Sequence, residues 1–212
     1  GYFRIFGSSP EAQLIVQDNK AEIHPIAGTF RRTGNDEKDA KAAEALAKDP
    51  KENSEHVMLV DLARNDLSRN GSKVEVEKNR EVQFYSHVIH LVSKVTCKMK
   101  KSAKTFRVVA DTFPAGTLSG APKHKALQLI DRYETTKRNF YGGAIGYMDF
   151  HGNFNHAIII RSFLSKNHEL HYQAGAGIVA DSVPENELQE VYNKLDALDK
   201  ALSLAENKKK KK

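Results

Sequence analysis

The sequence predicts an α+β fold, with antiparallel β-sheets made of hairpins and helices packed on their outside. Segments in which apolar and polar residues alternate are joined by turn signals such as Asp18-Asn19 and His151-Gly152-Asn153, a pattern typical of hairpins. Helical segments are grouped between the strand segments, which argues against a doubly wound parallel sheet. Because 40% of the 212 residues are hydrophobic, the chain can bury a sizeable core.

The N-terminal half begins with predicted strands at residues 2–6, 13–16 and 21–25, followed by a loop rich in Arg and Gly at residues 30–36. Residues 36–46 are rich in Ala, Lys and Glu and predict a helix that Asp49-Pro50 ends. A second helix is expected over about residues 51–67, closed by Asn70-Gly71. Alternation then predicts a short strand at residues 74–77 and a long one at residues 81–99.

The C-terminal half is expected to open with a helix before Phe113 and a loop at residues 113–122 that Gly and Pro punctuate. An amphipathic helix follows at residues 123–133, and strands are predicted at residues 141–150, 154–164 and 169–174. A final helix starts near Pro184, because proline suits a first helical turn, and runs to about residue 205.

Five of the six net positive charges lie in a run of five lysines at residues 208–212. Without these five, 28 Lys and Arg stand against 27 Asp and Glu, so the body of the chain is nearly neutral. A terminal lysine run is more typical of a solvated tail than of a binding site, so we expect no specific nucleic-acid partner.

The cellular setting is indicated by three features. No apolar run approaches the roughly 20 residues of a membrane helix, so no membrane partner is expected. The N-terminus, Gly1-Tyr2-Phe3-Arg4, lacks the regions of a signal peptide. The single cysteine, Cys97, excludes an intrachain disulfide and indicates a reducing cytoplasmic compartment.

Two Glu-x-x-Glu pairs, Glu52/Glu55 and Glu187/Glu190, are candidate metal ligands at the starts of two predicted helices. Residues three apart share a helix face, so each pair would present its carboxylates together. Mg²⁺ takes oxygen ligands and commonly completes its shell with an anionic substrate. Acidic residues in a first turn also favour the helix dipole, so spacing alone leaves a purely structural role open.

Two loops are candidate anion sites. Gly175 and Gly177 match the spacing of a dinucleotide motif, but residues 181–184 separate them from the next helix, so the context of that motif is missing. A backbone that approaches an anion through exposed N–H groups is the better interpretation, and a plain turn remains the alternative. The loop at residues 113–122 leads into a helix whose first N–H groups could hold a carboxylate or phosphate. A connecting loop that binds no ligand is the alternative.

Two further side chains lie in apolar strand segments. Arg161 ends the segment at residues 156–160 and must find an anionic partner or solvent. A carboxylate would suit its planar fork, and a structural ion pair is the alternative. His90 lies among apolar residues, where a histidine is more often a satisfied core residue than a catalytic one. Together these groups suit a small substrate with more than one carboxylate.

The chain resembles anthranilate synthase component I, a member of the chorismate-binding enzymes. The matching motifs keep the family's order and span nearly the whole chain up to the last helix: Ser9-Pro10-Glu11, Pro25-Ile26-Ala27-Gly28-Thr29, residues 54–67, residues 87–93, Gly116-Thr117-Leu118-Ser119-Gly120-Ala121-Pro122-Lys123, residues 141–147 and residues 173–184. The resemblance implies that the α+β fold is part of the α/β sandwich of this family. Residues 1–206 would form its chorismate-binding catalytic domain, and residues 207–212 a disordered Lys-rich tail.

The resemblance also implies a role for each candidate. Glu55 and Glu190 look like the principal Mg²⁺ ligands, with Glu52 and Glu187 in support. The ring carboxylate of chorismate would meet Gly28, Thr29 and Gly177, and the enolpyruvyl carboxylate would meet Tyr141, Arg161 and Gly175. Thr117 is expected to contact substrate, and Glu11 and His90 look like the acid/base residues near the leaving hydroxyl.

The implied reaction is the Mg²⁺-dependent conversion of chorismate to anthranilate and pyruvate in tryptophan biosynthesis, with ammonia supplied by a glutamine amidotransferase subunit. Ammonia adds at C2, the C4 hydroxyl leaves as water, and pyruvate is eliminated. Aminodeoxychorismate synthases often place a nucleophilic lysine at the position of Ala27, so alanine favours direct amination. The usual Arg after the motif's Thr is Phe30 here, followed by Arg31 and Arg32.

Family members are considerably longer than 212 residues, and the chain opens just before the Ser-Pro-Glu motif. We therefore expect the chain to lack an N-terminal part of the family fold. Two alternatives to an active lyase stay open: a catalytically incomplete fragment that binds ligand or partner, and a sister enzyme such as aminodeoxychorismate synthase.

Overall fold

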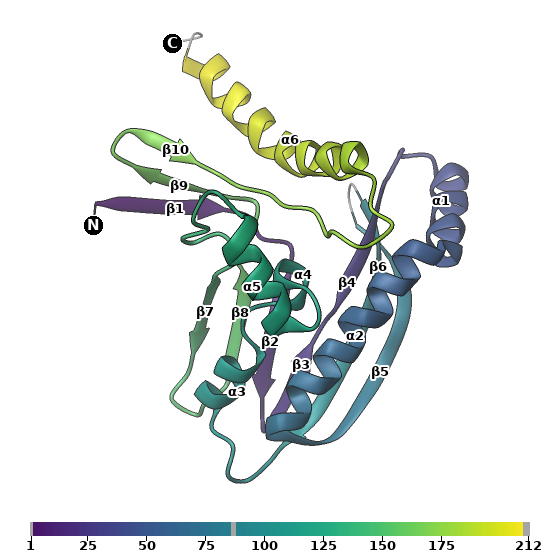
Figure 1. The fold of residues 1–212 in the computed structure, drawn as a ribbon, viewed down its shortest axis with the longest axis vertical. Helices are drawn as coiled ribbons and strands as arrows, with labels where there is room; N and C mark the ends of the chain where they lie inside the picture. Colours follow the sequence, from purple (N-terminus) through teal and green to yellow (C-terminus); the bar gives the residue numbers. More distant parts are fainter. Residues whose placement is uncertain (1, 86–87, 210–212) are drawn as a thin grey trace. The chain divides into compact units, whose positions relative to one another are not determined.

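The computed structural model describes residues 2–85 and 88–209, and of Thr29, Lys208 and Lys209 only the backbone (Figure 1). The chain divides into two compact units. One comprises Gly1–Pro10, Thr135–Ile145 and Ile158–Lys212, and the other comprises Glu11–Glu134 and Gly146–Ala157. The paired strands of the described residues are all antiparallel, which confirms the predicted α+β class.

The first unit holds a small sheet in the order β1-β9-β10, with bounds Phe3–Gly7, Ser162–Lys166 and Glu169–His171. The helix α6, Pro184–Lys209, also belongs to this unit. Aromatic rings stabilise the sheet: the ring centroids of Phe6 and Phe163 lie 5.4 Å apart, and those of Phe163 and Tyr172 lie 5.3 Å apart. Such tilted and edge-on ring pairs each contribute about 0.5–1.5 kcal/mol beyond their buried area.

The second unit is built on a seven-stranded sheet. Its strands run in the order β4-β6-β3-β2-β8-β7, and β5 also pairs with β6. Their bounds are Ala12–Gln17 for β2, Lys20–Ile23 for β3, Ile26–Arg31 for β4, Gly71–Phe84 for β5, Val88–Met99 for β6, Ala144–Met148 for β7 and Phe154–Ile158 for β8. The divisions between the two units fall inside β7 and β8.

The helices of the second unit are α1 Asp36–Lys48, α2 Pro50–Asn70, α3 Thr105–Thr112, α4 Gly116–Ser119 and α5 Lys123–Tyr133. Asp49 determines where α2 begins, because its side chain accepts a hydrogen bond from the Glu52 backbone N–H at 3.0 Å. Pro50 then occupies the first turn, where its missing N–H costs nothing. This cap places Glu52 and Glu55 in the opening turns of the longest helix of the unit.

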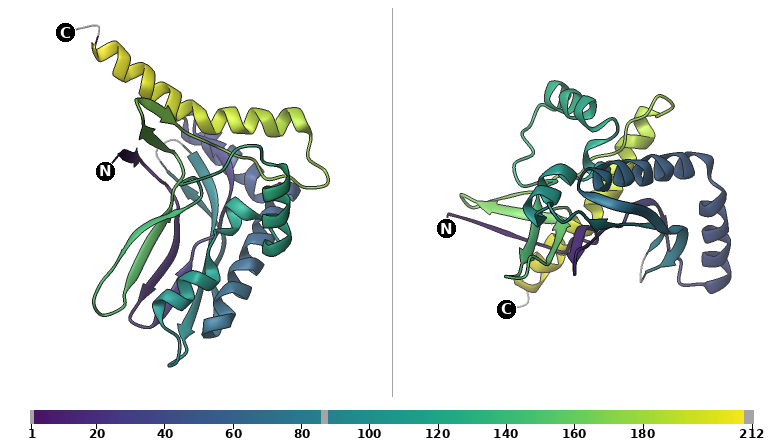
Figure 2. Two further views of the ribbon diagram at one scale, coloured as in Figure 1. Left: turned by 60° about the vertical axis from the view of Figure 1, so that its left-hand side comes forward. Right: turned by 90° about the horizontal axis from the view of Figure 1, so that it is seen from below.

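The core of the second unit lies between α2 and one face of the sheet (Figure 2). Val60 and Leu67 of α2 pack with Leu14, Ala21 and Val95 of three central strands. Each fully buried side chain of the size of Val or Leu contributes about 1.5–3 kcal/mol relative to its exposed state. This packing fixes the face of α2 that meets the sheet, and so fixes the direction of the neighbouring acidic residues.

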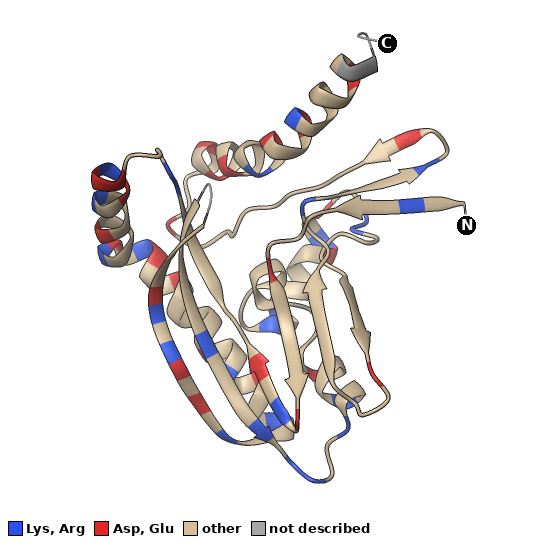
Figure 3. Ribbon diagram, turned by 180° about the vertical axis from the view of Figure 1, so that it is seen from behind, with Lys and Arg blue, Asp and Glu red and all other residues tan. Residues whose placement is uncertain are grey.

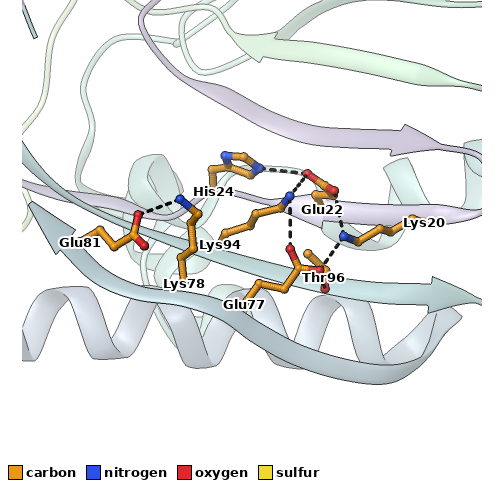
Figure 4. Close-up of polar contacts among 8 residues, drawn as sticks. All are labelled: Lys20, Glu22, His24, Glu77, Lys78, Glu81, Lys94 and Thr96. Carbon is orange, nitrogen blue, oxygen red and sulfur yellow. Dashed lines mark hydrogen bonds and ion pairs between the residues drawn. The ribbon is translucent and has the colours of Figure 1, made fainter. Parts of the chain in front are cut away.

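The alternate side chains of the same strands carry charge, and bands of both signs follow β5 in Figure 3. Lys94 bonds Glu22 at 3.0 Å and Glu77 at 3.3 Å, and Lys20 bonds Glu77 at 2.5 Å (Figure 4). Thr96 adds a hydroxyl that donates to Glu77 at 3.1 Å. These cross-strand contacts, which we call the sheet-face ion network, join β3, β6 and β5.

Three predicted elements differ from the structure. The predicted strand at residues 81–99 is the end of β5 and the whole of β6, because the chain reverses where the Tyr85 N–H donates to the Val88 carbonyl at 2.8 Å. The predicted strand at residues 154–164 is broken into β8 and β9, which lie in different sheets, and Arg161 has a φ of 51° between them. Part of the predicted loop at residues 30–36 belongs to β4, where Phe30 pairs with Ile89.

Two further elements extend the prediction. The loop at residues 113–122 contains the short helix α4, and α6 continues to Lys209, beyond the expected end near residue 205. The last residues of the expected tail, 210–212, lie outside the described residues. In the part of the chain that is described, no helix is both long enough and apolar enough to cross a membrane.

Candidate active site

A β-bulge at Gly28 organises the first group of candidate residues. The pairing of β4 with β6 shifts between Ala27 and Thr29, and Gly28 lies at this shift with a φ of +69°. A Cβ at this position would lie 2.7 Å from Leu46 Cδ1 and 3.1 Å from Glu52 Oε2. Glycine is therefore favoured by the positive φ and by the close approach of Leu46, with Glu52 slightly further away.

The bulge points the Gly28 carbonyl at His90. The His90 Nδ1–H donates to this oxygen at 2.8 Å, and the ring edge of Tyr85 packs on the imidazole with centroids 5.5 Å apart. A carbonyl oxygen only accepts, so the bond fixes the Nδ1 proton and assigns proton exchange to Nε2. The orientation of the His90 imidazole is thus fixed by this hydrogen bond and by the Tyr85 ring.

The candidate residue Gly28 therefore lies beside the candidate ligand Glu52 and is hydrogen-bonded to His90, all within the second unit. Glu55 lies one turn further along α2 and is half-buried. Thr29 is paired with His90 across the β4–β6 ladder, but its side chain lies outside what the structure describes.

Glu11 and Thr117, which are 106 residues apart in the sequence, are joined by a hydrogen bond. The Thr117 hydroxyl donates to Glu11 Oε1 at 3.0 Å. Both residues line a pocket of about 380 Å³, open solvent included, together with Leu59, Leu62 and Asp66 of α2. Burial raises the pKa of the Asp66 carboxyl, and the ammonium of Lys123 beside it opposes that rise.

Two candidates, Gly175 and Tyr141, lie close together in the first unit. A Cβ on Gly175 would lie 3.3 Å from the Tyr141 hydroxyl, so this phenol reaches the glycine loop. Around Gly177, an added Cβ would meet no described atom within 4 Å. The Arg161 backbone is held by the Ser8 N–H, which donates to the Arg161 carbonyl at 3.3 Å.

Lys194 connects the glycine loop to the acidic pair of α6. Its ammonium forms an ion pair with Glu190, one turn back, and donates to the Gly175 carbonyl at 2.8 Å. Glu187 lies on the preceding turn and is only 5% exposed, which is unusual for a carboxylate.

Sequence reasoning missed three of these residues. Lys194 had one usable signal, its spacing of four from Glu190. Asp66 and Lys123 both fall inside matched motifs, but nothing in the linear sequence pairs them. Their bond of 2.7 Å spans 57 residues, and only the folded chain reveals it.

Comparison with known proteins decides the family. Residues 1–200 match the chorismate binding enzyme family. The chain belongs to this family. It is 45% identical over 205 residues to anthranilate synthase component 1 of Aquifex aeolicus and 49% identical over 205 residues to that of Bacillus pumilus. These alignments cover 96% of this chain but 42% and 40% of the two relatives, so the chain spans about two-fifths of their length.

Solved structures of family members agree with this assignment. Anthranilate synthase component I from Streptococcus pneumoniae superposes with a TM-score of 0.84 at 42% identity, covering 92% of this chain and 43% of that one. A putative 2,3-dihydroxybenzoate-specific isochorismate synthase from Bacillus anthracis gives a TM-score of 0.86 at 28% identity, covering 95% and 54%. The resemblance predicted from the motifs is confirmed.

Proposed function

We propose that this chain carries the chorismate-converting chemistry of an anthranilate synthase component I. The observation that carries the proposal is the group at the β4 bulge. There the Gly28 carbonyl accepts a hydrogen bond from His90, and the missing side chain of Gly28 leaves room for Glu52 beside it.

The proposed reaction converts chorismate and ammonia to anthranilate, pyruvate and water. Ammonia forms the new C–N bond at C2, the C4 hydroxyl leaves with a proton as water, and loss of the enolpyruvyl group as pyruvate makes the ring aromatic. Hydroxide is a poor leaving group, so a proton must be delivered to it. Glu11 and His90 are the proposed acid/base residues, each oriented by a hydrogen bond from or to a neighbour.

Mg²⁺ is the proposed metal because carboxylate oxygens are the ligands that it prefers. Among the described residues, no group of three or more His, Cys, Asp or Glu side chains is already gathered into a metal site. We propose that Glu55 and Glu190 are the principal ligands, supported by Glu52 and Glu187. The ion, when bound, would neutralise and orient the ring carboxylate.

Binding of the substrate carboxylates is proposed for the remaining candidates. Gly28, Thr29 and Gly177 would contact the ring carboxylate through backbone and hydroxyl groups. Tyr141, Arg161 and Gly175 would contact the enolpyruvyl carboxylate, and Lys194 lies close enough to Gly175 to add a positive charge there. A glutamine amidotransferase subunit is the proposed source of ammonia.

Direct amination is favoured over the chemistry of a sister enzyme. Ala27 provides no nucleophile at the position where aminodeoxychorismate synthases often carry lysine, so no covalent bond between ring and enzyme can form there. Ala27→Lys should therefore not improve anthranilate formation.

The assay that tests the proposal follows anthranilate fluorescence after mixing the chain with chorismate, ammonium chloride and Mg²⁺. Turnover that EDTA removes supports it. The alternative, an incomplete fragment that binds ligand or partner, predicts chorismate binding by calorimetry without any product. Absence of both binding and turnover would reject the proposal.

A further inference from the structure

A buried ion pair lies under the loop that carries Thr117. The Lys123 ammonium donates to Asp66 Oδ2 at 2.7 Å and to the Thr112 carbonyl at 2.8 Å. Thr112 ends α3 and Lys123 begins α5, so these two residues flank the loop at residues 113–122. A single ammonium thus ties both ends of the loop to Asp66 on α2.

A second donor holds the same carbonyl. The Gln13 amide donates to the Thr112 carbonyl at 3.0 Å, and His156 Nε2 donates to Gln13 Oε1 at 2.8 Å. Gln13 stands two residues beyond Glu11, and both line the same pocket. The polar chain therefore runs from α2, through the base of the loop, to the strand that follows Glu11.

Gly116, in the middle of the loop at residues 113–122, also packs against α2. A Cβ on Gly116 would lie 2.5 Å from Leu62 Cδ2, so Gly116 allows the loop to approach the helix closely. The next residue, Thr117, reaches Glu11. Leu62 and Asp66 are one turn apart, so the flank of α2 that receives Gly116 also carries the anchor of the ion pair.

Burial makes each charge of the Asp66–Lys123 pair dependent on its partner, because an unpaired buried charge costs free energy. Asp66 is 5% exposed, and a buried carboxylate is tolerated only with a close partner. Replacing such a pair by apolar side chains is often neutral for stability. An apolar pair, however, has no donor for the Thr112 carbonyl, so stability and loop position can be separated experimentally.

We propose that Asp66 and Lys123 are positioning residues that hold residues 113–122 so that the Thr117 hydroxyl meets Glu11. This role rests on the proposed function of Glu11 as an acid/base residue. Neither member of the pair needs to touch substrate. The ion pair places Thr117, and the Thr117 hydroxyl in turn orients the Glu11 carboxylate by its hydrogen bond.

The test uses four variants of the full chain. Lys123→Met removes the ammonium. The double variant Asp66→Leu/Lys123→Met also removes the stranded carboxylate, so we expect it to fold even if the single variant does not. Lys123→Arg keeps a cationic donor. Lys125→Met makes the same change at an exposed position two residues along α5 and is the matched control.

Two measurements are made on each variant: amide hydrogen exchange of residues 113–120 without substrate, and kcat and KM for chorismate. In the double variant, exchange should be at least about tenfold faster than in wild type. A misplacement of about 1 Å should lower kcat about 10²-fold while KM changes much less. Lys123→Arg should recover slow exchange, and Lys125→Met should match wild type in both measurements.

A double variant with wild-type loop exchange and wild-type kcat would overturn the proposal, because the pair would then not determine the position of the loop. Absence of turnover in wild type would instead count against the proposed function. In that case the exchange measurement still decides whether the pair holds the loop, so the two failures are distinguishable.

Discussion

Gly28 is the residue on which the proposed site depends most directly. Its φ of +69° costs an L side chain about 1–2 kcal/mol, and an added Cβ would also press on Leu46 and Glu52. Gly28→Ala should therefore lower the melting temperature and reduce anthranilate formation, because the bulge must relax and move the carbonyl away from His90. Circular dichroism and the fluorescence assay measure the two effects.

Gly34→Ala is the matched control for Gly28→Ala. Gly34 has a φ of +79°, but an added Cβ there meets no described atom within 4 Å. Gly34→Ala should be destabilised only by the strain of an L residue at a positive φ. Its activity should be that of wild type. Equal losses of stability and activity in both variants would refute the packing argument at Gly28.

The burial of His56 should make the free energy of unfolding depend on pH. His56 is fully buried with Nε2 2.6 Å from Ser93 Oγ, and burial, helped by the charge of Arg80, lowers its pKa to about 4. The unfolded state, with a pKa of about 6.5, binds the proton first as pH falls. The stability from His56 is complete above pH of about 6.5 and is lost as pH falls towards about 4, by about 2 kcal/mol at pH 5.

Urea unfolding at several pH values between 7.5 and 4 checks this prediction. His56→Gln should flatten the fall in unfolding free energy across that range, and a substitution of the exposed His124 should leave it unchanged. Burial also lowers the pKa of His156, so part of the slope should persist in His56→Gln. A slope identical to that of wild type would show that His56 does not titrate in this way.

At the residue scale, the sequence identified most site candidates but not their partners. The types Glu, His and Arg in apolar or helix-start settings were informative because burying or pairing such groups has a cost that demands a reason. The Gly28–His90 bond spans 62 residues, and its geometry depends on a bulge that leaves no periodic signal. Lys123 and Asp66 were missed for the same reason.

At the element scale, the sheet-face ion network predicts how the sheet responds to acid. The bond from Lys20, followed by bonds from Lys94 and Thr96, lowers the pKa of Glu77 to about 2. Burial raises the pKa of Glu22, but Lys94, His24 and Lys20 outweigh it, so that pKa is also lowered. Stability from these carboxylates is present above pH of about 4.5 and is lost as pH falls towards about 2.

Thermal unfolding of Glu77→Gln between pH 6 and pH 2.5 measures this effect. The variant should melt below wild type at pH 6, and the two curves should approach each other towards pH 2.5, because the unfolded wild-type chain then binds a proton that the folded carboxylate binds less readily. Glu75→Gln changes an exposed neighbour on the same strand and should run parallel to wild type. A Glu77→Gln curve that stays parallel to wild type at all pH values would contradict the prediction.

Helices were predicted more accurately than strand ends. The helix at residues 123–133 and the start at Pro184 matched α5 and α6, because amphipathic periodicity and proline mark helix positions locally. The reversal between β5 and β6 was missed because Ser86-His87 contains no Gly, Pro or Asn. The break between β8 and β9 was missed because Arg161 adopts a positive φ that its residue type does not suggest.

At the scale of the whole molecule, the motifs meet within each compact unit in spite of their separation along the chain. Glu11 meets Thr117, and Gly175 is joined to Glu190 through Lys194. The resemblance to a family grouped Gly175 with Tyr141, whose hydroxyl reaches that glycine, but it paired neither Glu11 with Thr117 nor Gly175 with Glu190. No linker composition marks the division into two units, because the divisions fall inside strands β7 and β8.

The measurement that tests the central claim most directly is anthranilate fluorescence from chorismate, ammonium and Mg²⁺, in wild type, Glu190→Gln and Glu185→Gln. Glu185 is an exposed acid in the same first turn of α6, so its variant controls for charge at the helix start. Wild type and Glu185→Gln should form anthranilate in a way that EDTA abolishes, and Glu190→Gln should be at least about tenfold slower at limiting Mg²⁺. Equal, EDTA-insensitive rates in all three would contradict the account.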